Sequence, residues 1–173
     1  MLFRSMDLDP ISGEITYGLE RIAQFLQDVD SIYDIVWTRD PETGAEMTYG
    51  DVRLHEEQQF SAYSFDYADV EKLWEHLRLY EAECLALLAR AKDVVSEKSA
   101  DALAVKRFPT LGAYELALKC SHVFNLLDAR GAISVTERVG VMARIRTLVV
   151  GVAKAYAAQG VALAATQKEK EVA

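Results

Sequence analysis

The chain has 173 residues, of which 51% are hydrophobic and 27% are charged, and its formal net charge is −8. This length is enough for one domain with its own core, and the composition is typical of a soluble globular protein, which excludes a disordered chain. The negative charge excludes a protein that attracts phosphate over its whole surface. Binding to a nucleic acid would therefore need a local basic patch or a second subunit.

The cysteines and the apolar segments indicate in which cellular compartment the protein is found. Cys84 and Cys120 lie inside apolar helical patterns, so we expect buried, reduced thiols and neither a disulfide nor a metal site. The three histidines show no ligand spacing, which disfavours zinc. Residues 1–10 include acidic side chains where a secretory signal has an apolar stretch. The most apolar segment, residues 147–165, contains a lysine and a glutamine, so we predict no membrane span and a cytoplasmic protein.

After an irregular start over residues 1–12, Gly13–Gly18 (GEITYG) predicts a short strand with Glu14 and Thr16 on one face. Helical periodicity follows at once in LERIAQFLQDV and places Arg21 in the first turn of a helix. Helix N-termini favour anions, and an arginine there adds a bidentate partner for phosphate. A helix with one early arginine is usually just a solvent-exposed helix. These residues alone therefore favour a structural role over a binding site.

The middle of the chain alternates loops and helices. Residues 38–51 carry a proline and two glycines and predict a loop or a short hairpin. We expect residues 52–68 to form a helix followed by an extended stretch. Residues 69–91 have one apolar stripe at helical spacing, and Asp69 is the expected N-cap. Residues 92–110 are charged and small, and we interpret them as a linker between helices that could include one helical turn.

Two further helices are predicted towards the C-terminus. Residues 111–130 are apolar on more than one face, as in a helix buried between neighbours, and Gly131 fits the position just after its end. The sequence SVTE, Ser134 to Glu137, is a capping box that marks the start of the next helix. That helix is expected to run to about residue 165 and to leave a solvated tail.

Four blocks of the sequence resemble, in the same order, the α subunit of bacterial-type glycyl-tRNA synthetase: GEITYGLERIAQFLQDVDSIYDIVW, TYGDV, FDYADVE and HVFNLLDARGAISVTERVGVMARIRTL. Together they cover the chain from about residue 12 to 164. The first block resembles motif 3 of class II synthetases, a strand followed by a helix whose arginine contacts ATP. The resemblance implies a mainly α fold, with a strand–helix remnant of the class II antiparallel sheet domain over residues 1–66 and a C-terminal helical bundle over residues 67–173.

The resemblance also implies a function and a site. The parent enzyme is an α2β2 glycine–tRNA ligase that activates glycine with ATP, uses Mg²⁺ with the ATP, and binds tRNA(Gly) mainly through its β subunit. By this resemblance Arg21 is the catalytic arginine of motif 3 and contacts ATP. Glu14 and Thr16 face the pocket for glycine and the adenylate, and Gly13 and Gly18 allow close backbone approach. No bound cofactor and no metal ligand are expected in the chain itself.

The sequence departs from the family at its start. Motifs 1 and 2 lie upstream of motif 3 in the family, and only twelve residues precede Gly13 here. We therefore expect a C-terminal fragment that is inactive alone. The alternative is a non-enzymatic helical module that binds a synthetase β subunit. Motifs 1 and 2 encoded in frame upstream of the first codon would favour the ligase, and a stop codon with a ribosome-binding site there would favour the module.

Two groups of side chains each have two interpretations. The last block contains four arginines that form a surface for tRNA or the β subunit, or else ion pairs and caps that tie two helices together: Arg130, Arg138, Arg144 and Arg146. We favour the ion pairs and caps, because the acidic residues between the arginines neutralise the patch. Four aromatic residues recur at short spacing: Phe60, Tyr63, Phe65 and Tyr67. They could stack on bases, but packing against the catalytic domain is favoured, because no basic residue lies between residues 60 and 70.

Overall fold

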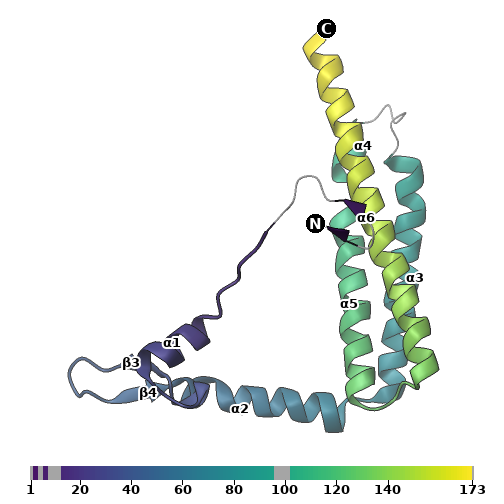
Figure 1. Cartoon of the computed structure of the whole chain (residues 1–173). Helices are drawn as coiled ribbons and strands as arrows, with labels where there is room; N and C mark the ends of the chain where they lie inside the picture. Colours follow the sequence, from purple (N-terminus) through teal and green to yellow (C-terminus); the bar gives the residue numbers. More distant parts are fainter. Residues whose placement is uncertain (1, 4–5, 8–12, 96–101, 173) are drawn as a thin grey trace. The chain divides into compact units, whose positions relative to one another are not determined.

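The computed structural model describes residues 2–3, 6–7, 13–95 and 102–172, with the backbone alone over residues 2–3, 6–7 and 165–172. The chain divides into two compact units, Met1–Phe60 and Ser61–Ala173 (Figure 1). Long helices dominate, and the described strands are short and antiparallel. The predicted fold class, mainly α with a small remnant of sheet followed by a helical bundle, is confirmed.

The N-terminal unit consists of short elements around one hairpin. In chain order they are β1 (Leu2–Phe3), β2 (Met6–Asp7), α1 (Leu19–Gln27), the 3-10 helix η1 (Ile32–Asp34), β3 (Val36–Arg39), β4 (Glu46–Thr48) and α2 (Tyr49–Ala62). Strand β1 pairs with β2, and β3 pairs with β4. The second pair is the hairpin expected within residues 38–51, although those residues also include the start of α2.

Local polar contacts explain the hairpin and its attachment to α1. The carboxylate of Asp40 accepts hydrogen bonds from the backbone N–H groups of Glu42 and Thr43, both at 2.8 Å, which is a turn that aspartate favours. The amide side chain of Gln27 accepts from the backbone N–H of Val36 at 2.7 Å and donates to its carbonyl at 3.1 Å. Gln27 therefore replaces a neighbouring strand beside β3 and holds the end of α1 against the hairpin.

Gly50 marks a close approach within the same unit. A Cβ atom added at this position would lie 2.9 Å from the backbone carbonyl oxygen of Tyr33, closer than real Cβ contacts allow. Only glycine fits there without a shift of the backbone, although Gly50 lies in the first turn of a helix.

Two predictions for the first 68 residues were wrong. Gly13–Gly18 is not a strand, because its backbone has no ladder partner among the described residues, and an unpaired strand cannot satisfy its backbone hydrogen bonds. The extended stretch expected before residue 69 is instead the π-helix η2 (Tyr63–Tyr67), which continues directly from α2. Most of residues 1–12, for which an irregular start is expected, lies outside the described residues.

The helical unit contains three long helices that run alongside one another, α3 (Val70–Val94), α5 (Thr110–Ala129) and α6 (Val135–Val172) (Figure 1). The short helix α4 (Ala102–Arg107) lies in the predicted linker and contacts α6. Helix α6 extends past residue 165, and the exposure of the expected solvated tail lies outside the described side chains.

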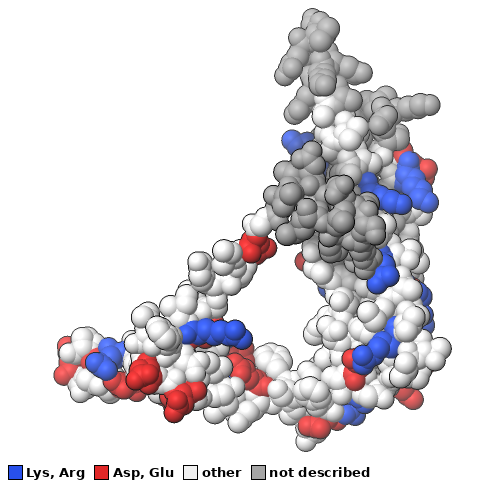
Figure 2. All heavy atoms as spheres, viewed as in Figure 1, with Lys and Arg blue, Asp and Glu red and all other residues white. Residues whose placement is uncertain are grey.

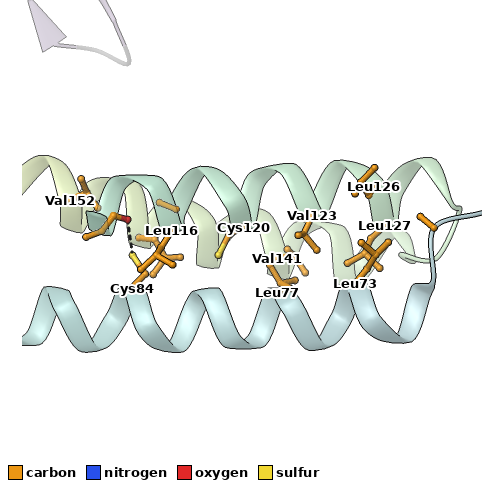
Figure 3. Close-up of a cluster of buried hydrophobic side chains, with 14 residues drawn as sticks. Leu73, Leu77, Cys84, Leu116, Cys120, Val123, Leu126, Leu127, Val141 and Val152 are labelled. Carbon is orange, nitrogen blue, oxygen red and sulfur yellow. Dashed lines mark hydrogen bonds between the residues drawn. The ribbon is translucent and has the colours of Figure 1, made fainter. Parts of the chain in front are cut away.

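The three long helices share one apolar core, in which buried side chains of each helix face the other two (Figure 3). Its larger members are Leu73, Leu77, Leu116, Val123, Leu127, Val141, Leu148 and Val152. They recur at spacings of four and seven residues, which places them on one stripe of each helix. Cys84 and Cys120 are fully buried and free, as predicted. The Cys84 thiol donates to the Ala113 carbonyl at 3.3 Å, and desolvation raises the pKa of Cys120 to about 11.

The helix ends follow the capping signals in the sequence. The Asp69 carboxylate accepts from the Lys72 backbone N–H at 3.1 Å at the start of α3. Gly131 has a φ of 63° just after α5, in the left-handed region that glycine favours. Ser134 and Glu137 form the reciprocal capping box: the Glu137 N–H donates to the Ser134 hydroxyl at 3.2 Å, and the Ser134 N–H donates to the Glu137 carboxylate at 3.0 Å. All three predictions are confirmed.

Sequence reasoning missed one set of hydrogen bonds, which the side chain of Gln159 makes. Gln159 of α6 donates from Nε2 to the carbonyl of Val105 at 2.7 Å and to that of Phe108 at 3.2 Å. Its side-chain oxygen accepts from the Thr110 hydroxyl at 2.9 Å. One side chain thus satisfies the turn that joins α4 to α5, and an isolated glutamine in a helical pattern gives no sign of that role.

Helix α6 is apolar over much of its length. Between Val135 and Ala164 it is long and apolar enough to cross a membrane, judged by length and composition alone. A single helix of this kind is weak evidence, because core helices of soluble proteins pass the same test. Val141, Leu148 and Val152 of this segment are buried in the core shared with α3 and α5.

Candidate functional site

Arg21 lies where the sequence places it, at the third residue of α1. The helix begins at Leu19, and Gly18 is an N-cap without a side-chain capping bond. The first-turn N–H groups of α1 and the guanidinium of Arg21 therefore lie at the same helix end, which favours an anion. Arg21 is exposed, and none of the ion pairs found in the described part of the chain involves it.

Glu14 and Thr16 are brought together. The Thr16 hydroxyl donates to the Glu14 carboxylate at 2.5 Å, so both side chains lie on the same side of an extended segment. The alternation that predicted this pairing holds, although the segment is not part of a sheet. Both residues are exposed. The pair lies two residues before the start of α1, so the carboxylate and the arginine are near one another in the chain.

No steric contact among the described residues requires glycine at positions 13 and 18. A Cβ atom at Gly13 would meet nothing within 4 Å, and one at Gly18 would lie 3.9 Å from Cγ of Arg21, which is ordinary contact. The hypothesis that Gly13 and Gly18 admit a close approach by a ligand stays a prediction.

Helix α1 presents an apolar face that no described residue covers. Leu19, Phe25 and Leu26 are 75%, 85% and 76% exposed, whereas the opposite side of the helix is held to the hairpin through Gln27. An amphipathic helix normally buries its apolar stripe. The exposed stripe next to Arg21 is therefore a surface suited to a further layer of protein.

The arginines of the last block connect elements of the helical unit. Arg130 donates from Nε to the carbonyl of Ala68 at 3.1 Å and from its terminal nitrogen to the carbonyl of Phe65. Two others form ion pairs, Arg138 with Asp128 and Arg144 with Glu81. The favoured ion pairs are found for Arg138 and Arg144, whereas Arg130 makes its structural contacts with backbone carbonyls. Within the described residues Arg146 is exposed and makes no ion pair.

The aromatic residues before α3 are solvent-exposed. Tyr63, Phe65 and Tyr67 are 48%, 59% and 80% exposed, and the structure shows no layer over them. Neither base stacking nor packing against a catalytic domain is tested by this arrangement, so both interpretations stay open.

Metal binding can be examined only in the described part of the chain. No group of three or more His, Cys, Asp or Glu side chains there could hold a metal ion.

The geometry and the family comparison point the same way. An extended segment with a paired carboxylate and hydroxyl leads into a helix with an arginine in its first turn, and a helical bundle with a capping box at Ser134 follows. The family model described as "Glycyl-tRNA synthetase alpha subunit" matches residues 3–160, which is most of the chain. The chain therefore belongs to the glycyl-tRNA synthetase α-subunit family, whose members serve ATP-dependent glycine–tRNA ligases together with a β subunit.

Proposed function

We propose that this chain supplies one wall of the active site of a glycine–tRNA ligase, which activates glycine as glycyl-adenylate and transfers it to tRNA(Gly). The observation that carries the proposal is the exposed Arg21 at the start of α1, directly after the bonded pair Glu14 and Thr16. A free guanidinium at a helix N-terminus is suited to phosphate, and the carboxylate of Glu14, seven positions earlier in the chain, is suited to the ammonium group of an amino acid.

Each residue then has a defined task. Arg21 would hold ATP so that the carboxylate of glycine attacks the α-phosphate in line, while the bond to the bridging oxygen breaks and pyrophosphate leaves, and its charge would stabilise the negative charge that develops there. Glu14 binds the ammonium group of glycine. Thr16 fixes the orientation of Glu14 by its hydrogen bond, and Gly18 leaves room beside the nucleotide. Magnesium arrives with ATP in this proposal and neutralises part of the phosphate charge.

The proposal extends to partners and compartment. Residues 1–66 would complete the catalytic domain, and residues 67–173 would form the helical domain of an α2β2 enzyme in the cytoplasm. The chain has a net charge of −8, so tRNA would bind mainly to the β subunit. The 173 residues contain no segment like motif 2, the expected second holder of the α-phosphate, so we expect no glycine-dependent pyrophosphate exchange from the purified chain alone.

The test of the site is substitution of Arg21 in an α subunit that carries this segment, assembled with its β subunit. We expect Arg21→Ala to lower glycine-dependent ATP–pyrophosphate exchange by roughly two to three orders of magnitude, as for loss of a charge contact to the reacting nucleotide. Arg21→Lys should lower it less, because lysine keeps the charge but not the planar fork.

The matched control is Arg39→Ala. Arg39 is an exposed arginine of the same unit that pairs with Glu46 in the hairpin, so its loss should leave exchange within about twofold of the parent. Size-exclusion chromatography should show unchanged α–β assembly for both variants. Near-normal exchange by Arg21→Ala would remove Arg21 from the site. The alternative of a non-enzymatic helical module would be favoured if the protein bound its β subunit and the assembly showed no exchange even without a substitution.

A further inference from the structure

A hollow of about 260 Å³ lies between α1 and the hairpin of the N-terminal unit. Its lining residues are Leu19, Glu20, Ala23, Gln27, Ile35, Val36, Trp37 and Tyr49. None of the residues assigned to glycine or ATP lines it. The hollow is therefore separate from the site proposed for adenylate formation.

Two aromatic rings form one wall of this hollow. The rings of Trp37 and Tyr49 lie 5.6 Å apart between centroids and are tilted by 37°. Trp37 is 52% exposed although it is a large aromatic residue, and so part of its face is open to a ligand. Aromatic faces attract cations through the ring quadrupole, and tryptophan does so best.

The polar groups of the hollow are not equally available. Both polar atoms of the Gln27 amide are used by the backbone of Val36. Glu20 makes no hydrogen bond or ion pair with any described residue. Its carboxylate lies close enough to Tyr49 to raise the pKa of that phenol, after the larger effects of desolvation and of Glu57. Arg53, whose charge lowers the pKa of Tyr49, is already paired with Glu56 at 2.7 Å. The hollow thus offers one unpaired carboxylate beside two ring faces.

The unit around the hollow is negatively charged, as is the Glu20 carboxylate inside it. Residues 13–60 hold eleven acidic and three basic side chains, a formal charge of −8, which equals the charge of the entire chain. Acidic side chains gather over this unit in Figure 2. The remaining lining is aliphatic: Leu19, Ala23, Ile35 and Val36. An aliphatic wall that ends at a carboxylate and two rings matches a side chain with a hydrocarbon stem and a cationic head.

We propose that this hollow is a binding site for the lysine or arginine side chain of a partner protein, with the stem against Leu19 and Ala23 and the cationic head between Glu20, Trp37 and Tyr49. The site docks a protein and has no part in the chemistry of glycine activation. It does not depend on the ligase assignment, because none of its lining residues is among those that we assign to that reaction.

The test uses the indole N–H resonances of the 173-residue chain in NMR spectra, with Nα-acetyl-lysine methylamide and Nα-acetyl-arginine methylamide as probes. Trp74 of the helical unit is the internal control, because the chain has two tryptophans and only Trp37 lines the hollow. We expect a saturable shift of the Trp37 resonance at millimolar probe, with no shift for Trp74. Nα-acetyl-norleucine methylamide, which has the stem without the charge, should give about one-fifth of the affinity or less.

Two variants and one competing salt test whether the site recognises the charge of the side chain. Glu20→Gln should weaken the lysine probe about fivefold and leave the norleucine probe unchanged, since it removes the charge and keeps the shape. Glu42→Gln, which changes an exposed acid of the same unit outside the hollow and outside the proposed glycine site, should leave both probes unchanged. Equal binding of the lysine and norleucine probes would overturn the cationic site. Tighter binding of tetramethylammonium chloride than of the lysine probe would also overturn it, because the ligand would then be a free cation and not a side chain.

Discussion

Arg130 joins the end of α5 to the π-helical turn that precedes α3, across more than sixty residues of chain. Its guanidinium donates to two backbone carbonyls, those of Phe65 and Ala68, and its own side chain is half-buried. Removing it leaves both carbonyls without this donor. We therefore expect Arg130→Ala to destabilise the helical unit.

The magnitude follows from the two hydrogen bonds. A hydrogen bond to a charged group contributes roughly 1.5–3 kcal/mol to stability, and these two are partly solvated, so water replaces part of the loss. We expect Arg130→Ala to lower the free energy of unfolding by about 2 kcal/mol. Arg130→Lys should restore less than half of the loss, because one ammonium cannot reach both carbonyls in the geometry of the planar fork.

Urea titration followed by tryptophan fluorescence measures this change. In a Trp37→Phe background the only tryptophan left is Trp74 in α3, so the signal reports the helical unit. The matched control is Arg146→Ala, an exposed arginine of the same block without an ion pair in the described residues, for which we expect a loss below about 0.5 kcal/mol. Equal losses for the two alanine variants would refute the assignment of a structural role to Arg130.

Substitutions at three further places in the fold test the capping box, the glycine positions and the Gln159 hydrogen bonds. Ser134→Ala should lower the free energy of unfolding by about 1 kcal/mol in urea titration. Because hydrogen bonds from Ser134 lower the pKa of Glu137, the cap should stabilise the fold at neutral pH and fail as the pH falls through that lowered pKa, and Glu137→Gln should abolish this pH dependence. If Glu137→Gln lost stability at low pH as the parent protein does, that result would contradict the cap. Gly50→Ala should destabilise the N-terminal unit by about 1–3 kcal/mol, measured by Trp37 fluorescence, because its Cβ would meet a backbone carbonyl, whereas Gly140→Ala, with open space, should stabilise α6 by up to about 1 kcal/mol. Gln159→Met should cost about 1–3 kcal/mol in thermal unfolding, and no loss would show that water replaces its three bonds.

Capping signals could be interpreted from the sequence, because they depend on residues within one helical turn. Asp69, Gly131 and the pair Ser134 and Glu137 form the contacts that their types and spacing predict. The apolar stripes of α3, α5 and α6 are local in the same sense, since a 3.6-residue period places their members on one face without reference to a partner.

The candidate site was predictable only in part. The alternation of an extended chain puts Glu14 and Thr16 on one side, and helical spacing puts Arg21 in the first turn of α1. Whether Gly13–Gly18 forms a strand depends on a partner strand elsewhere, and no periodicity reports its presence. The hollow beside Glu20 was not predicted, because Trp37 and Tyr49 come to it from the hairpin and the start of α2.

By itself, the sequence determined the helix boundaries near caps, the apolar faces, the burial of both thiols and the family. Those properties arise from neighbours within a turn or from the order of residues along the chain. Only the tertiary structure decided that Arg130 bonds the carbonyls before α3, that Gln159 closes the turn between α4 and α5, and that Gly50 faces a carbonyl. Each of these contacts joins residues that are distant in sequence, and a hydrogen bond or a steric clash at short range leaves no periodic trace in either segment.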